Sequence, residues 1–245
     1  MEHQKLVNSA NFPVTPGTLT AAEIRQRVGK VDPVIVEVGA NCGQTTAELL
    51  GAMPEATIFA FEPDPRAIAK FRDAISSPRV HLYECAIGAV NGTVNFHQSS
   101  GAEHLAEYSE GWDQSGSIRR PNSHLKVWPW VRFEKQIMVP IMTLDTWSEQ
   151  HHIAAADFIW ADVQGAESDL VEGAPRFLRS SRFLYTEYSN DEWYEGQITL
   201  AGLLEKLPDF DLVRRYPMDA LFENRRMARK GSSKSFRTLY PPIRL

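Results

Sequence analysis

The chain alternates between short apolar runs and longer segments in which apolar and polar residues are mixed. Apolar runs typical of buried strands occupy residues 34–38, 56–61, 80–85, 157–163 and 183–188. Segments with helical periodicity lie between them at residues 64–75, 143–151, 168–178 and 198–207. A closing hairpin is predicted at residues 210–216 and 219–222. Because strands that alternate with helices form a mostly parallel sheet covered on both faces, the pattern predicts an α/β fold.

A few stretches fit this alternation less directly. Residues 18–28 predict a helix capped by Thr20. Residues 93–97 predict a hairpin strand, and residues 136–142 predict a further strand. Pro140 confines this last strand to an edge position, because proline donates no hydrogen bond to a neighbouring strand.

The regular pattern breaks down over residues 98–135, which are rich in serine, glycine and proline. A loop of this length inside a compact domain is either functional or partly disordered. Its bulky aromatic residues offer faces for stacking on a sugar or ring, or they pack into a small core of their own. These residues are Trp112, Trp128, Trp130 and Phe133. We expect the segment to be an acceptor-binding insertion or lid.

The apolar run at residues 34–38 leads into the sequence GANCGQT. Gly39 and Gly43 let the backbone approach a ligand closely, and the helix that follows points its first N–H groups at that ligand. A dinucleotide fingerprint has glycines where Asn41 and Gln44 stand here, which disfavours NAD.

Glu37 further limits which ligand this turn could bind. Its carboxylate, just before the turn, would repel a pyrophosphate but pair with an ammonium group. S-adenosylmethionine carries such a group and has no phosphate. Glu62, at the end of the next strand, is placed to accept hydrogen bonds from ribose hydroxyls, and Pro63 follows it. The backbone at Cys85 and Ala86, where the third strand ends, is expected to edge an adenine pocket.

Two carboxylates end the fourth and fifth predicted strands, Asp162 and Glu187. The carboxyl ends of adjacent parallel strands open on the same cleft, so both carboxylates are expected to face that cleft. With Glu167 or Asn190 they would bind a divalent cation that lowers the pKa of an acceptor hydroxyl. The metal-free alternative is favoured, because two acidic residues are few ligands for a divalent cation.

In the metal-free alternative a carboxylate or a histidine is the general base. The histidine candidates in or beside the irregular segment are His97, His104 and His124. The catalytic residues predicted from the sequence are Asp162, Glu187 and His104.

Several motifs together resemble the FkbM family of S-adenosylmethionine-dependent methyltransferases. They are EVGANCGQT (37–45), FEPDP (61–65), AIG (86–88), TLD (143–145), ADVQGAESDLVEGA (161–174) and TEY (186–188). The resemblance implies a class I methyltransferase fold, Rossmann-like with seven strands, and methyl transfer to a hydroxyl, often on a sugar or polyketide. It also implies that Glu37, Gly39, Asn41 and Gly43 hold the methionine part of the cofactor and that Glu62 holds the ribose.

The chain departs from the family pattern at three places. Glu37 replaces an aspartate, Gln164 replaces the glutamate of the family's D-V-E-G motif, and a lysine that commonly precedes that motif is replaced around Trp160. These departures keep two alternatives open. One is a cofactor-binding partner subunit without activity, which the acidic residues Asp162 and Glu187 argue against, and the other is an N- or phenol methyltransferase.

Length and composition set the frame. The 245 residues, of which 43% are hydrophobic, suit one α/β domain with additions or at most two small domains. With 23% charged residues and a net charge of −5, the chain has no overall electrostatic field that would favour nucleic acid or a membrane. We expect a lead-in and helix at residues 1–30, the methyltransferase domain at 31–224 and a basic tail at 225–245. That tail is solvated, packs on a second subunit in a homodimer, or attracts an acidic acceptor. Two cysteines without a spaced framework, no signal sequence and no bilayer-spanning run predict a cytoplasmic protein.

Overall fold

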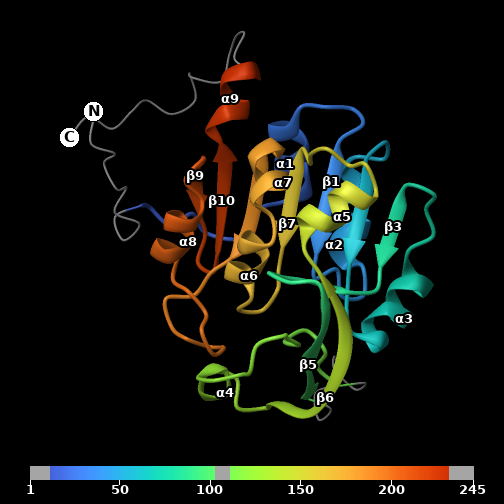
Figure 1. The fold of residues 1–245 in the computed structure, drawn as a ribbon, viewed down its shortest axis with the longest axis vertical. Helices are drawn as coiled ribbons and strands as arrows, with labels where there is room; N and C mark the ends of the chain where they lie inside the picture. The colour runs from blue at the N-terminus through green and yellow to red at the C-terminus, as the bar shows by residue number, and fades with distance from the viewer. Residues whose placement is uncertain (1–11, 103–110, 232–245) are drawn as a thin grey trace.

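The computed structural model describes residues 12–102 and 111–231, and a seven-stranded sheet runs through it (Figure 1). From edge to edge the strand order is β3-β2-β1-β7-β8-β10-β9. The bounds are β1 Val34–Val38, β2 Thr57–Phe61, β3 Val80–Tyr83, β7 Phe158–Ala161, β8 Phe183–Glu187, β9 Phe210–Arg215 and β10 Asp219–Asn224. Neighbours from β3 to β8 are parallel, whereas β10 is antiparallel to β8 and β9. The predicted seven-stranded, mostly parallel sheet is confirmed.

Helices cover both faces of this sheet (Figure 1). On one face Ile24 and Leu49 share a buried cluster with Ile35 of β1, and on the other Trp147 packs in a cluster with Val36 of β1. Because successive residues of β1 face opposite clusters, the strand is apolar at every position except Glu37 instead of alternating between apolar and polar residues. The helices are α1 Ala21–Val28, α2 Gln44–Ala52, α3 Pro65–Ala74, α5 Leu144–Gln150, α6 Glu167–Glu172, α7 Pro175–Ser180, α8 Leu200–Lys206 and α9 Arg225–Gly231.

Helix starts follow the capping signals in the sequence. The Thr20 side chain accepts a hydrogen bond from the Glu23 backbone N–H, and the Glu23 side chain bonds back to Thr20. Asp64 accepts a hydrogen bond from the backbone N–H of Arg66 at the start of α3. Such caps satisfy N–H groups that have no partner within the helix.

The single helix predicted over residues 168–178 is wrong, because the chain breaks it into α6 and α7. A Cβ atom on Gly173, between the two helices, would lie 2.0 Å from the Gly88 carbonyl oxygen. Pro175 then opens α7. The break lets the backbone pack against the segment after β4, and a proline cannot continue the preceding helix.

A smaller sheet has the order β4-β6-β5, with β4 at Ala86–Ile87, β5 at Gly92–Gly101 and β6 at Val131–Met142. The prediction that residues 136–142 form an edge strand is therefore wrong, since β6 is the middle strand. Pro140 is tolerated there because β4 pairs with β6 only at Ile141 and Met142. At Pro140 itself, β6 is paired with β5 alone.

The segment at residues 98–135 is more regular than predicted, because β5 and β6 extend into it from both ends and α4 spans His124–Val127. The small sheet projects beyond the carboxyl ends of the parallel strands of the large sheet (Figure 1). Among the helices that the structure describes, none combines the length and apolarity needed to cross a bilayer.

Candidate active site

The turn between β1 and α2 brings two strand ends together. Gly39 has a φ of 84°, and a Cβ atom there would lie 1.9 Å from the carbonyl oxygen of Asp162, just after β7. Gly43 has a φ of 85°, and no side chain caps α2 at this position. Asn41, between the two, also has a positive φ of 45°. The first N–H groups of α2 are therefore open to a ligand, and the turn requires glycine where the strands meet.

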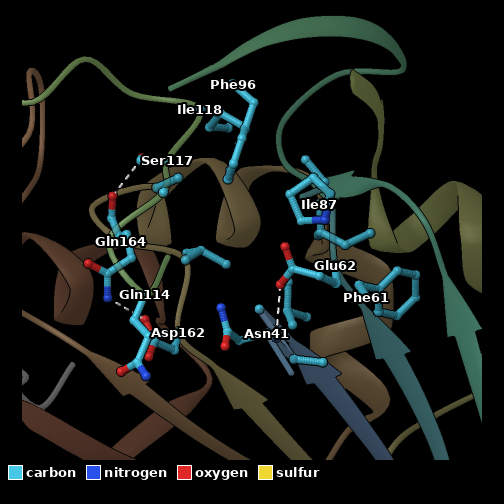
Figure 2. A pocket seen from close by; sticks show the side chains of 18 of the residues that line it. Asn41, Phe61, Glu62, Ile87, Phe96, Gln114, Ser117, Ile118, Asp162 and Gln164 are labelled. Carbon is cyan, nitrogen blue, oxygen red and sulfur yellow. Dashed lines mark hydrogen bonds between the residues drawn. The ribbon is translucent and has the colours of Figure 1, made fainter. Parts of the chain in front are cut away.

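A pocket opens where this turn meets the ends of β2 and β7 (Figure 2). The predicted cofactor residues that line it are Gly39, Asn41, Glu62, Pro63, Cys85, Ala86 and Asp162. The irregular segment supplies a further wall, made of Asp113, Gln114, Gly116, Ser117 and Ile118. The pocket thus joins segments that lie far apart in the sequence.

Glu62 is 5% exposed and lies on the β2 side of the pocket. Its Oε2 accepts a hydrogen bond of 2.8 Å from the Asn41 backbone N–H, and its Oε1 accepts one of 2.8 Å from the Asp64 backbone N–H. Burial raises the pKa of Glu62 to about 7. A carboxylate oxygen has more than one acceptor position, so both oxygens can still accept hydrogen bonds from a ligand hydroxyl.

An apolar slot adjoins Glu62. Ile87 of β4 lines it from one side, and Phe96 of β5 and Ile118 of the irregular segment line it from another (Figure 2). Cys85 also lines the pocket, and burial raises the pKa of its thiol to about 11, so the thiol is neutral. Apolar side chains and a neutral thiol beside a carboxylate suit a nucleoside with an apolar ring face and ribose hydroxyls.

Asp162 and Glu187 follow β7 and end β8, which pair in parallel. The Gln164 side chain joins them, because its Nε2 donates hydrogen bonds to Asp162 Oδ1 at 2.7 Å and to Glu187 Oε2 at 2.9 Å. Asp162 and Gln164 line the pocket, with Gln164 between Asp162 and Ser117 (Figure 2). Glu187 lies behind them, outside the lining.

Burial raises the pKa of each carboxyl group in this cluster. The pKa of Asp162 is raised by burial, and that of Glu187 is raised well above its usual value by burial and then by the charge of Asp162. Burial also raises the pKa of Glu167 to about 7. Since two like charges at close range resist ionisation together, one carboxyl group of the Asp162 and Glu187 pair keeps a proton while the other is ionised.

This geometry can be compared with known proteins. Residues 37–223 match the family described as the methyltransferase FkbM domain. The chain belongs to the FkbM methyltransferase family. The 2-O-methyltransferase NoeI of Sinorhizobium fredii (strain NBRC 101917 / NGR234) is 43% identical to it over 203 residues, which cover 81% of this chain and 82% of NoeI.

Solved structures align less closely with this FkbM methyltransferase. An rRNA methylase from Streptococcus thermophilus aligns with a TM-score of 0.44 and 11% identity over 83% of this chain and 93% of its own. The plantazolicin methyltransferase BpumL in complex with SAH aligns with a TM-score of 0.39 and 11% identity over 76% and 58%. The family match shows that this chain is an S-adenosylmethionine-dependent methyltransferase, as predicted. It argues against the alternative of an NAD-binding protein.

Glu37 and Gly43 are the predicted cofactor residues of this FkbM methyltransferase that do not line the pocket. The Glu37 side chain is 1% exposed, and its Oε2 accepts a hydrogen bond of 2.6 Å from the Thr46 hydroxyl of α2. Its Oε1 is buried without a hydrogen-bond partner. Burial raises the pKa of Glu37 to about 8, so near neutral pH this carboxyl group is largely protonated behind the glycine turn.

The other two departures from the family pattern both line the pocket. Trp160 stands where the sequence lacks the family's lysine, and its ring packs 4.5 Å from that of Tyr185. Gln164 has a positive φ of 51° in the tight turn that follows β7. An indole and an amide therefore occupy positions where the family has charged side chains.

The histidine candidates lie away from the pocket or outside the described residues. His104 falls in the latter group, so its predicted catalytic role stays a prediction. His97 is 7% exposed, and burial lowers its pKa. His124 is packed among the rings of Trp128, Phe133 and Tyr194, and burial lowers its pKa to about 4. Neither His97 nor His124 lines the pocket.

The aromatic residues of the irregular segment pack on one another. Trp112 and Trp130 meet edge to face with centroids 5.0 Å apart, and Trp128 meets Trp193 at 4.8 Å. None of these rings lines the pocket, so the small-core alternative describes them. Tyr194, which contacts this cluster and also reaches Gln164 from behind the pocket lining, is one of the residues at the site that the sequence did not reveal. It carries no motif, and only the folded loop after β8 brings it there.

Proposed function

We propose that this FkbM methyltransferase methylates a hydroxyl oxygen of a sugar, a glycan or a secondary metabolite. The observation that carries the proposal is the Asp162 carboxylate, which lines the same pocket as Glu62 and faces the wall of the irregular segment. A polar pocket wall with a carboxylate suits an acceptor that must give up a hydroxyl proton. The relative NoeI is named a 2-O-methyltransferase, so the hydroxyl at position 2 of a sugar is the first acceptor to test.

In this proposal the cofactor spans the ends of β1, β2 and β4. Glu62 accepts hydrogen bonds from the ribose hydroxyls. Backbone N–H groups of the turns beside the pocket bind both of its oxygens and so fix the orientation of the carboxylate. When bound, S-adenosylmethionine supplies an electrophilic methyl group. The other proposed cofactor residues are Gly39 and Asn41 at the methionine part, Asp162 beside it, and Pro63, Cys85 and Ala86 along the adenine. Glu37 and Gly43 lie behind this lining and shape the turn from within.

Asp162 is the proposed general base. A sugar hydroxyl is a weak nucleophile until it loses or shares its proton, and a positioned base is typically worth about 10²–10⁴ in rate. The acceptor proton passes to the Asp162 carboxylate. Glu187 does not line the pocket, but it accepts a hydrogen bond from the same Gln164 amide as Asp162. It therefore influences whether Asp162 is ionised without touching the acceptor.

One feature supports metal-free chemistry over a cation site. The Gln164 amide nitrogen donates to both carboxyl groups and so occupies the space between them. Adding Mg²⁺ or Mn²⁺ to enzyme treated with EDTA should leave turnover unchanged, and a large gain in turnover would restore the cation.

The irregular segment is the proposed wall for the acceptor. Gln114 and Ser117 bring polar groups to the pocket from this segment, and Asp113 forms an ion pair of 2.8 Å with Lys70 of α3.

The domain limits, a homodimer and a cytoplasmic location stay predictions from the sequence. Cys42 and Cys85 are both free thiols.

The test is methyl transfer from a ¹³C-labelled methyl donor to a panel of sugars, oligosaccharides, phenols and amines. The proposal expects labelled methoxy groups on hydroxyl acceptors, detected by mass spectrometry and NMR, with sugars ahead of phenols. Label found on nitrogen would favour the N-methyltransferase alternative. A protein that binds S-adenosylhomocysteine but methylates nothing in the panel would favour the partner subunit without activity.

A further inference from the structure

Gln164 lies between the acceptor wall and the buried carboxyl groups. Its Nε2 donates to Asp162 and Glu187, while its Oε1 lies 3.0 Å from the Tyr194 hydroxyl. Its backbone carbonyl accepts a hydrogen bond of 2.7 Å from the Ser117 hydroxyl. Both polar groups of this side chain therefore have partners, which are Asp162, Glu187 and Tyr194, and Ser117 holds the backbone of the same residue.

The turn that carries Gln164 is shaped around Tyr194. Gly165 has a φ of 89°, and a Cβ atom there would lie 2.7 Å from Tyr194 Cβ. Tyr194 is 1% exposed, and its hydroxyl also lies 2.8 Å from the Ser115 carbonyl oxygen. A non-glycine residue with positive φ, such as Gln164, is held by its surroundings. Tyr194 thus fixes both the backbone and the side chain of this position.

The amide of a glutamine has a donor end and an acceptor end, so its orientation decides which charge state it favours. With Nε2 toward Asp162 and Glu187, the amide stabilises an ionised carboxylate. Rotated by half a turn, it would present Oε1 to the carboxyl groups and favour their protonated forms. The Tyr194 hydroxyl has a single proton, which is shared between Gln164 Oε1 at 3.0 Å and the Ser115 carbonyl oxygen at 2.8 Å, and the share donated to Oε1 favours the first orientation.

We propose that Gln164 is a positioning residue for methyl transfer, and that its amide, oriented by Tyr194, keeps the Asp162 carboxylate aimed and ionised to accept the acceptor's proton. In this step the acceptor O–H bond breaks and the proton passes to Asp162, while Gln164 exchanges no proton. The inference rests on the proposed function. The titratable and charged groups around Asp162 are Glu187 of β8, Glu167 of α6, Asp219 of β10, Tyr194 and, next to Glu167, Arg119.

The substitutions Gln164→Leu and Tyr194→Phe test the inference. Both should raise the pKa of Asp162, because a donor to its ionised form is lost or released. A base must be ionised to act, so the acidic limb of kcat against pH should move to higher pH, by about one pH unit in Gln164→Leu and less in Tyr194→Phe. The affinity for S-adenosylhomocysteine should stay within about twofold of the wild type.

Tyr188→Phe is the matched control. Tyr188 is 3% exposed, and its hydroxyl donates a hydrogen bond of 3.0 Å to the Tyr216 carbonyl oxygen and accepts one of 2.7 Å from Arg215 Nε, away from the pocket lining. The control loses a buried tyrosine hydrogen bond as Tyr194→Phe does. It should lower Tm without moving the pH profile, so a general loss of stability is separated from an effect on Asp162.

A second readout needs no acceptor. When folding raises the pKa of a carboxyl group, the folded protein loses stability as the pH rises through that pKa. Gln164→Leu should therefore lose more Tm between about pH 5 and pH 8 than Tyr188→Phe does. If the wild type methylates no hydroxyl but this difference appears, the proposed function fails and the orientation of Gln164 stands. If the wild type is active while the pH profile and Tm trend of Tyr194→Phe match the control, the inference is overturned, even if Gln164→Leu does not fold.

Discussion

Glu62→Gln is the substitution that addresses the cofactor end of the pocket most sharply. The Glu62 oxygens each accept one backbone N–H, from Asn41 and from Asp64, and the proposal adds ribose hydroxyls to both. A glutamine can offer only one oxygen. Whichever way its amide turns, an NH₂ group faces a backbone N–H, and one ribose hydroxyl loses its acceptor.

The size of the effect follows from these contacts. A hydrogen bond to a charged group contributes about 1.5–3 kcal/mol, so losing the one to the ribose should weaken S-adenosylhomocysteine binding by about 10- to 150-fold. The pKa of Glu62 is raised to about 7 by burial, and the ionised form is the better acceptor. Wild-type affinity should therefore fall by up to about tenfold per pH unit below pH 7, and this dependence should be absent from Glu62→Gln.

Isothermal titration calorimetry of S-adenosylhomocysteine measures both effects. Asp64→Asn is the matched control, because Asp64 is 1% exposed and caps α3 yet does not line the pocket. It should cost stability and leave affinity within about twofold above about pH 8, where Glu62 is ionised, while the loss of the Asp64 charge lowers the pKa of Glu62 and extends its ionised range to lower pH. The ribose role of Glu62 is refuted if Glu62→Gln, folded by circular dichroism, binds as tightly as Asp64→Asn at every pH.

Three further predictions concern the fold around the pocket. Gly39→Ala should cost about 2–6 kcal/mol in urea unfolding, because φ is 84° and the new Cβ would lie 1.9 Å from the Asp162 carbonyl oxygen; a loss below about 1 kcal/mol would contradict the close approach of β1 and β7. Lys70→Met should cost less than about 1 kcal/mol in the same assay, since the Lys70 side chain in its ion pair with Asp113 is 39% exposed, and a loss of several kcal/mol would disprove this. Burial raises the folded-state pKa of Glu37 to about 8 from 4.5, so its contribution to stability is complete below about pH 4.5 and lost as pH rises through 8. Differential scanning calorimetry should show Tm falling over that range, and a Tm that rises steadily from pH 5 to pH 8 would be inconsistent with a buried, protonated Glu37.

The features that the sequence predicted correctly are local ones. The apolar run of β1, the glycines that follow it and the acidic end of β2 each depend on residues that are neighbours in the chain. The same holds for the cap of α3 by Asp64, where a short side chain bonds an N–H two residues on. These signals were enough to place the cofactor candidates at one edge of a parallel sheet.

The features that the sequence did not predict depend on contacts between distant segments. Nothing near Tyr194 signals that its hydroxyl reaches Gln164, because the loop after β8 must first fold over the turn after β7. The place of β6 at the centre of the small sheet depends on pairing with β4, which has only two residues. The bond from Thr46 to Glu37 likewise depends on how α2 packs over β1, and it withdraws a predicted cofactor residue from the pocket lining.

Asp162 is the proposed general base, and it lines the pocket together with Glu62 and the wall formed by the irregular segment. Asp162→Asn keeps the shape of the side chain and removes its capacity to accept a proton. Single-turnover methyl transfer to the best hydroxyl acceptor should slow by about 10²–10⁴ in this variant, while it still binds S-adenosylhomocysteine. An Asp162→Asn enzyme that transfers the methyl group as fast as the wild type would contradict the account.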